Sequence, residues 1–146
     1  MRLAIVSLLL VLTAPTDLAA EVNLNPEGLA LHGYDPVAYL DDGTAVMGSS
    51  DFTAEHDGAV YQFASKDNRD RFLASGSGYV PQYGGFCAYG VRMGQKFDIN
   101  PEAFSVIDGR LYVLLDNATH SLWLQDPETN IRIADETWPQ LQGLSD

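Results

Sequence analysis

Three Asp-Gly pairs divide the chain into short segments and constrain its fold more than any other feature. They are Asp42-Gly43, Asp57-Gly58 and Asp108-Gly109. An Asp-Gly pair between two β-prone runs is a strong signal for a tight hairpin, because both residues tolerate positive φ angles. The sequence therefore predicts three β-hairpins, and the clearest has its strands at 103–107 and 110–115.

Helices are expected between and after these hairpins. Ser65, either Asp116 or Asn117, and Asp126 are suitable N-caps, and Pro139 is expected to end the last helix. The expected helices and their inward-facing residues are 66–74 with Phe72 and Leu73, 117–125 with Leu122 and Trp123, and 127–138 with Ile131, Ala134 and Trp138. The pattern predicts an α+β fold, a small single domain of β-hairpins packed with three to four short helices. No internal repeat is evident.

The first residues have the pattern of a secretory signal peptide. Arg2 is followed by an apolar run at 3–12, and a small-residue cleavage site precedes Glu21. We expect cleavage after about Ala20 and a periplasmic or secreted product. The expected organisation is a signal peptide at 1–20, an N-terminal arm at 21–27, a domain at 28–139 and a C-terminal tail at 140–146.

The formal net charge of −12 narrows the classes of partner. Such a surface repels nucleic acid, so we expect no nucleic-acid partner, and it attracts cations. A metal ion or an unidentified protein partner fits this charge, although an exported protein can be acidic for solubility alone. No second long apolar run follows residue 20, so we expect no membrane span in the mature chain. The oligomeric state stays open.

Several motifs are similar to those of the YHS domain family, in particular its exported bacterial single-domain members. The segments that carry the resemblance are Asp35-Pro36-Val37, Tyr61–Ser65 with Phe72, Tyr83–Tyr89, Ile99–Phe104 and Asp108–Tyr112. The resemblance spans about 28–139 and implies a YHS-like fold. Related YHS and TRASH-type domains bind metals through cysteines. Three positions where the family carries cysteine are Ala38, Ala64 and Asn68 in this chain, so its usual thiol ligands are missing.

Cys87 is the only cysteine, and it follows the Gly84-Gly85 pair. If a helix begins just after the glycines, its N-terminal N–H groups and dipole favour the thiolate, which is a soft metal ligand. Cys87, His32 and Met93 are therefore candidate ligands for a soft metal ion, with copper the most plausible. No pair of these residues has a recognised ligand spacing. The other interpretation is that Cys87 is a small buried apolar residue.

Two further functions stay open. Tyr34, Asp35, Tyr83 and Tyr89 could form an aromatic surface that binds a protein or a small ligand without metal. Cys87 could also be the nucleophile of a one-cysteine thiol enzyme, but no base is located by the sequence. The leading hypothesis is a non-enzymatic exported protein that binds copper or another soft metal through the Cys87 region.

Overall fold

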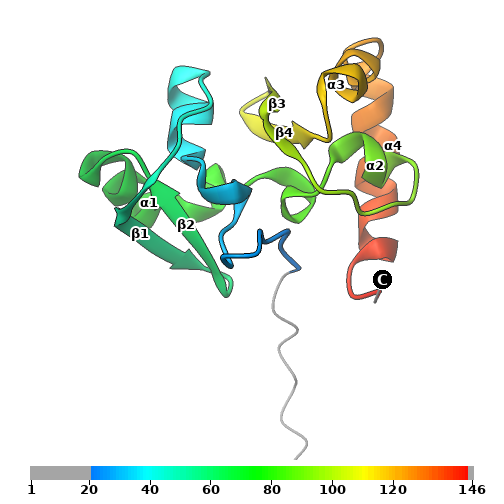
Figure 1. The fold of residues 1–146 in the computed structure, drawn as a ribbon. Coiled ribbons are helices and arrows are strands. Elements are labelled where there is room, and N and C mark those ends of the chain that lie inside the picture. The colour runs from blue at the N-terminus through cyan, green and yellow to red at the C-terminus, as the bar shows by residue number, and fades with distance from the viewer. Residues whose placement is uncertain (1–20, 145–146) are drawn as a thin grey trace, which may run out of the picture.

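A computed structural model describes residues 21–144, and the expected signal peptide at 1–20 lies outside this range. The fold is α+β, a small single domain in which two separate antiparallel hairpins pack with helices, as the sequence predicts (Figure 1). The elements are η1 (Leu31–Gly33), η2 (Ala38–Asp42), β1 (Ser49–His56), β2 (Ala59–Phe63), α1 (Lys66–Tyr79), η3 (Gln82–Gly85), α2 (Ala88–Arg92), β3 (Asn100–Ile107), β4 (Arg110–Leu114), α3 (Asn117–Trp123) and α4 (Pro127–Leu141).

Two of the three expected hairpins are confirmed. Asp57 and Gly58 have φ angles of 49° and 79°, and Asp108 and Gly109 have 50° and 71°. Positive φ at both central residues is the turn geometry that matches the twist of a two-stranded ribbon. The third prediction is wrong. Gly43 instead ends the helical turn η2 in a left-handed conformation, and the expected strand at 44–47 contributes only an isolated bridge.

The two hairpins belong to two halves of the chain with the same backbone plan. We call residues 31–80 the first half and residues 83–131 the second half. In each half an eight-residue strand pairs with a five-residue strand. The register breaks at the same place, between the pairs Ser49↔Phe63 and Thr53↔Gln62 and between Asn100↔Leu114 and Phe104↔Val113. The expectation of no internal repeat is therefore wrong at the level of the backbone.

The helices after the hairpins also correspond. Ser65 and Asp116 cap α1 and α3 by accepting from the backbone N–H three residues ahead. The kink of α1 at Ser75, with φ −147°, matches the break between α3 and α4 at Asp126, with φ −153°. The two halves lie side by side, and α4 extends beyond the matched region along the second (Figure 1).

In each half, one aromatic residue of a helix packs into the core against the hairpin. Phe72 packs on Tyr61 with ring centroids 5.0 Å apart, and Trp123 packs on Tyr112 at 5.2 Å. Phe72 and Trp123 are buried as expected, but their neighbours Leu73 and Leu122 are 61% and 43% exposed. Consecutive residues of a helix point in directions about 100° apart, so only one of each pair can face the core.

The expected end of the first helix near Ala74 coincides with a break, because Ser75 has non-helical φ and ψ angles and α1 consists of two helical segments that meet there, the second of which ends at Tyr79. The expected end at Pro139 is wrong. Helix α4 continues past Pro139 to Leu141. Pro139 removes only one intrahelical hydrogen bond, and the helix ends two residues later. Within residues 21–144, no helix combines the length and apolar character needed to cross a membrane.

Candidate functional site

Each half begins with the same left-handed turn. The φ angles are 52°, 54° and 83° in Leu31–Gly33, and 55°, 62° and 77° in Tyr83–Gly85. The chain then reaches Asp35 in the first half and Cys87 in the second. Asp35 N donates to Val46 O at 2.8 Å, and Cys87 N donates to Phe97 O at 2.9 Å. Asp35 and Cys87 therefore occupy matching positions.

Asp35 is fully buried, and its carboxylate serves as an internal acceptor. It accepts hydrogen bonds from the N–H groups of Val37 at 2.8 Å, Ala38 at 3.3 Å and Ala64 at 2.8 Å, and from Asn68 Nδ2 at 2.7 Å. Ala38, Ala64 and Asn68 are the three positions where the family resemblance implies cysteines. They converge on this carboxylate. Because both oxygens are occupied internally, Asp35 has no free face for the ligand role that the sequence suggested.

Cys87 plays a similar but weaker part in the second half. It is the N-cap of α2, and its Sγ accepts from Gly90 N at 3.4 Å and from Leu115 N at 3.2 Å. The expected helix start is therefore correct, but the expected thiolate is not favoured. The side chain is 0% exposed, and this burial raises the pKa of the Cys87 thiol despite the N–H groups that oppose the shift.

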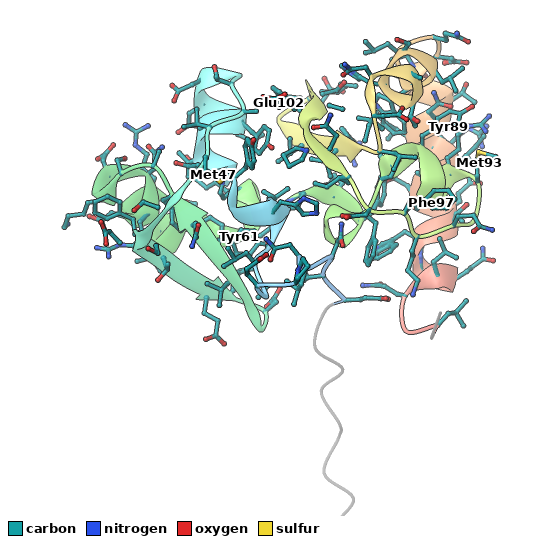
Figure 2. All side chains as sticks on the ribbon, in the orientation of Figure 1. Met47, Tyr61, Tyr89, Met93, Phe97 and Glu102 are labelled. Carbon is teal, nitrogen blue, oxygen red and sulfur yellow. The ribbon has the colours of Figure 1, made fainter. Side chains whose placement is uncertain are left out.

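An open pocket of about 230 Å³ lies over Cys87. We call it the Cys87 pocket. Its lining is almost entirely apolar or aromatic and comprises Cys87, Tyr89, Gly90, Met93, Phe97, Leu115, Thr119 and Leu122. Met93, Phe97, Leu115 and Leu122 are between 41% and 62% exposed, so large apolar side chains form its rim. Figure 2 shows Tyr89, Met93 and Phe97 on the α2 side of the molecule.

The matching space in the first half is filled by polar side chains. Asn68, which matches Thr119, reaches the Asp35 carboxylate. Arg71, which matches Leu122, pairs with Asp41 at 3.1 Å, and Asp41 belongs to η2, the helical turn that corresponds to α2 with Met93 at its end. The same backbone therefore carries two pairs of polar side chains in one half and an open apolar pocket in the other.

The remaining predicted site residues are dispersed. His32 does not line the Cys87 pocket, and its Nε2 lies 2.7 Å from Asp98 Oδ1. Tyr83 is buried and its hydroxyl donates to Asp135 at 2.8 Å. Tyr34 pairs with Met47 in an isolated bridge. Of the candidates, only Met93 and Tyr89 share the pocket with Cys87.

Phe97, Leu115, Thr119 and Leu122 were missed as site residues by sequence reasoning. Leu122 was placed in the core because apolar residues usually face inward. The signal that could have identified it is an alignment of the two Asp-Gly hairpins, in which Leu122 and Arg71 occupy the same position. An apolar residue at a position that is charged and solvent-facing in a matching half indicates a surface with a function.

Comparisons with protein families, curated proteins and solved structures found no match. The similarity to YHS domains stays a proposal. Among residues 21–144, no group of three or more His, Cys, Asp or Glu side chains is placed to hold a metal ion.

Proposed function

We propose that this protein is a non-enzymatic binding module for a small, neutral, apolar molecule, held in the Cys87 pocket. The observation that carries the proposal is the difference between the halves. Where the first half has Asp35, Asn68 and Arg71, the second half has Cys87, Thr119 and Leu122, and it exposes the apolar side chains of Met93 and Leu122. Exposed apolar residues around a concavity are typical of ligand sites.

The pocket volume indicates the size of the ligand. An apolar cavity of about 150 Å³ accommodates benzene. At about 230 Å³, the Cys87 pocket has room for a molecule moderately larger than benzene, such as a substituted monocyclic or small bicyclic aromatic. Tyr89 offers a ring for stacking, and Met93 offers a flexible, polarisable side chain that adapts to such rings. Neutral ligands are favoured because no charged side chain lines the pocket.

The test is binding of indole and toluene by the mature chain, followed through the amide signals of Gly90 and Leu115. Both N–H groups donate to the Cys87 sulfur at the base of the pocket. We expect saturable shifts at both amides. The variant Met93→Asp/Thr119→Asn/Leu122→Arg rebuilds the polar side chains of the first half, and we expect it to weaken binding by at least about tenfold.

The matched control is Leu124→Arg. Leu124 is 52% exposed and follows α3 directly, but it does not line the pocket. We expect this variant to bind both probes like the wild type. Absence of saturable shifts in the wild type would contradict the proposal, as would an equal loss in the control.

Soft-metal binding is a second candidate, because the sulfur-bearing residues Cys87 and Met93 line the same pocket. Thiolate and thioether ligands suit Cu(I). Competition for Cu(I) by the wild type, Cys87→Ala, Met93→Leu and His32→Ala tests it. A metal held by the two sulfurs would be lost in the first two variants and retained in His32→Ala, whereas equal weak binding by all four proteins would exclude this candidate.

A thiol enzyme receives less support. A nucleophilic cysteine needs a lowered pKa or a neighbouring base. Burial shifts the Cys87 pKa upward, and neither histidine nor carboxylate lines its pocket. We therefore expect slow alkylation of Cys87 in the folded protein.

A further inference from the structure

Another pocket lies where the N-terminal arm, the first half and α4 meet. It has a volume of about 110 Å³, and we call it the Tyr61 pocket. Its walls include Glu21 of the arm, Asp57, Tyr61 and Val80 of the first half, and Trp138 of α4. Among the described residues, the Tyr61 pocket and the Cys87 pocket share no lining residue, so the two are separate candidate sites.

The Tyr61 hydroxyl is a polar group without a partner on a nearly buried side chain. Tyr61 is only 2% exposed, and its hydroxyl makes no hydrogen bond within residues 21–144. Solvent nevertheless reaches this oxygen, whereas the oxygen of Tyr112, its counterpart in the second half, is sealed from solvent. Because Tyr61 lines the pocket, its hydroxyl meets solvent there. A phenol can both donate and accept a hydrogen bond, and both capacities are unused.

The phenol of Tyr61 is neutral at pH 7 and available as an acceptor. Burial, and to a lesser extent the negative charge of Asp57, raises the pKa of Tyr61 above its ordinary value of 10. Both residues line the pocket, and no hydrogen bond within residues 21–144 joins the hydroxyl to the Asp57 carboxylate. A ligand in the pocket can therefore contact the phenol oxygen and the carboxylate together.

The charged groups around the pocket favour a cation. The Glu21 carboxylate is occupied, because Lys96 Nζ lies 2.8 Å from it and Gly143 N donates to it at 3.0 Å. Asp57 has a looser contact, 3.4 Å from His56 Nε2, and 60% of its side chain is exposed. Among the described residues, no lysine or arginine lines the pocket, and the whole chain carries a formal charge of −12. The electrostatic potential at the pocket therefore attracts positive ligands.

The size and the apolar walls of the pocket narrow the choice of cation. A cavity of about 150 Å³ accommodates benzene, so a pocket of about 110 Å³ requires a smaller ligand. Tyr61 and Trp138 supply aromatic rings, which attract methylated ammonium groups, and Val80 and Pro81 add aliphatic surface. Dimethylammonium matches these walls, because it has two methyl groups for the apolar surface and two N–H donors for the acceptors.

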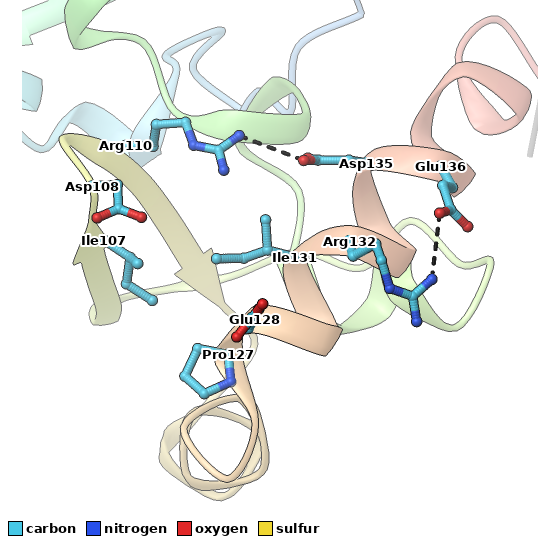
Figure 3. Close-up of a pocket in the computed structure, with 9 residues that line it drawn as sticks. All are labelled: Ile107, Asp108, Arg110, Pro127, Glu128, Ile131, Arg132, Asp135 and Glu136. Carbon is cyan, nitrogen blue, oxygen red and sulfur yellow. Dashed lines mark hydrogen bonds and ion pairs between the residues drawn. The ribbon is translucent and has the colours of Figure 1, made fainter.

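The second half offers a comparison with the Tyr61 pocket. Its matching concavity is a wider groove of about 820 Å³ between the turn of the β3–β4 hairpin and α4 (Figure 3). Arg110 and Asp135 line this groove and pair with each other at 3.5 Å. Tyr112 is not among the described residues that line it. An unused hydroxyl that opens into a pocket therefore distinguishes the Tyr61 pocket from its counterpart.

From this combination we propose that the Tyr61 pocket binds a small methylated ammonium ion and that dimethylammonium is its best match. The Tyr61 oxygen and the Asp57 carboxylate accept from the two N–H groups, and the methyl groups contact Val80 and Trp138. The site is independent of the binding proposed for the Cys87 pocket, so either proposal can fail alone.

The experiment titrates the mature chain with dimethylammonium chloride, which replaces sodium chloride so that the ionic strength stays constant. The readout is the indole N–H signal of Trp138. Trp123, the other tryptophan, is 0% exposed in the core and serves as the internal reference. We expect a saturable shift at Trp138 and no change at Trp123. A Trp138 signal that does not saturate would show that the pocket holds only water or diffuse ions, and it would overturn the proposal.

Tyr61→Phe tests the hydroxyl. It removes a group that has no hydrogen bond, so we expect unchanged stability, whereas binding weakens about fivefold to tenfold because the ammonium loses an acceptor. Tyr112→Phe is the matched control, since it removes the counterpart hydroxyl, which is sealed from solvent. We expect this control to bind within about twofold of the wild type. Wild-type affinity in Tyr61→Phe, or an equal loss in the control, would contradict the proposal.

Asp57→Asn tests the charge, with Asp108→Asn as its control. The two residues occupy the same turn position with φ angles of 49° and 50°, which asparagine tolerates. We expect binding to weaken about threefold to fivefold in Asp57→Asn and to stay within about twofold in Asp108→Asn. An equal loss in both variants would show that binding follows net charge alone and would overturn the proposal.

Tetramethylammonium tests the two N–H donors. It carries the same charge and more methyl groups but has no N–H group, and it is larger. We expect it to bind at least about fivefold more weakly than dimethylammonium. Equal binding of the two ions would contradict a site built around the Tyr61 oxygen and the Asp57 carboxylate.

Discussion

The two halves of the molecule share a backbone and differ in what fills it. Both have a left-handed entry turn, a hairpin with the same register break and a capped helix with one buried aromatic residue. The first half has a buried hydrogen bond between Asn68 and Asp35 and an exposed ion pair between Arg71 and Asp41. The second half has Cys87 in place of Asp35 and leaves an apolar pocket beside it.

This contrast separates structural residues from functional ones. A backbone that is stable with its interior filled does not require an opening, so the opening in the second half has another cause. Asp35 and Cys87 do the same structural task, because each holds the N–H groups of a following helical turn and of the segment after a strand. The sulfur therefore has a structural role, and in the proposed function the surrounding Met93, Phe97 and Leu122 are the residues expected to contact the ligand.

The largest expected effect on stability comes from replacing the two matching residues, Asp35 and Cys87. Asp35→Ala leaves four hydrogen-bond donors without their acceptor, two of them on the buried residues Val37 and Ala38. We expect the free energy of unfolding to fall by about 3–5 kcal/mol, measured by urea denaturation. Cys87→Ala removes a weaker acceptor and little volume, and we expect a loss of about 1–2 kcal/mol. Equal losses in the two variants would show that these residues are not structural counterparts.

The sequence predicts the hairpins and caps but not the relation between the halves. Asp57-Gly58 and Asp108-Gly109 determine their turns locally, and Ser65 and Asp116 cap their helices through bonds three residues long. Such local chemistry can be identified in any sequence. The shared plan depends on backbone geometry that different side chains satisfy, as with Asp35 and Cys87. For this reason similarity between the halves is hard to detect residue by residue.

The second-largest expected effect on stability comes from a substitution in the left-handed turn at which each half begins. Gly84 has φ +62°, and a Cβ there would lie 2.1 Å from the carbonyl oxygen of Glu21. We expect Gly84→Ala to lower the free energy of unfolding by about 2–4 kcal/mol in urea denaturation, because both the clash and the φ angle oppose alanine. The matching residue of the first half is His32, which takes the same conformation with φ 54°.

His32→Gly provides the reciprocal change. Glycine relieves the left-handed strain by about 1–2 kcal/mol but loses the contact with Asp98 and increases the entropy of the unfolded chain. Because these terms oppose each other, we expect a net change within about 1 kcal/mol. A large loss in His32→Gly together with a small loss in Gly84→Ala would reverse the comparison of the two turns.

The candidate site could be predicted only in part from the sequence, because residue types are visible there but their grouping in space is not. Cys87 and Met93 are conspicuous as residue types, and the pocket brings them together with Tyr89. His32 is also a candidate ligand by residue type, but its position in the left-handed turn directs its side chain to Asp98. Residue type indicates what a side chain can bind, whereas the backbone conformation decides which side chains meet.

The smallest expected effect is on stability at low pH, and it depends on Asp98 of the second half, which contacts His32 of the first half. Burial acts to raise the pKa of Asp98, but hydrogen bonds from Asn23 Nδ2 at 2.9 Å, from the Ile99 backbone and from His32 outweigh it and hold that pKa below its ordinary value of 3.8. A carboxyl whose pKa is lowered by folding stabilises the protein above its unfolded pKa, and this contribution is lost as pH falls through the lower, folded value. The window therefore lies below about pH 4. Because 64% of the Asp98 side chain is exposed, solvent screening limits the contribution to about 0.5 kcal/mol or less.

We expect urea denaturation from pH 6 to pH 3 to show that the free energy of unfolding falls slightly less for Asp98→Asn than for the wild type. The exposed Asp51→Asn is the control. A steeper acid loss in Asp98→Asn would show that the pKa of Asp98 is raised by folding and that its contact with His32 does not stabilise the carboxylate.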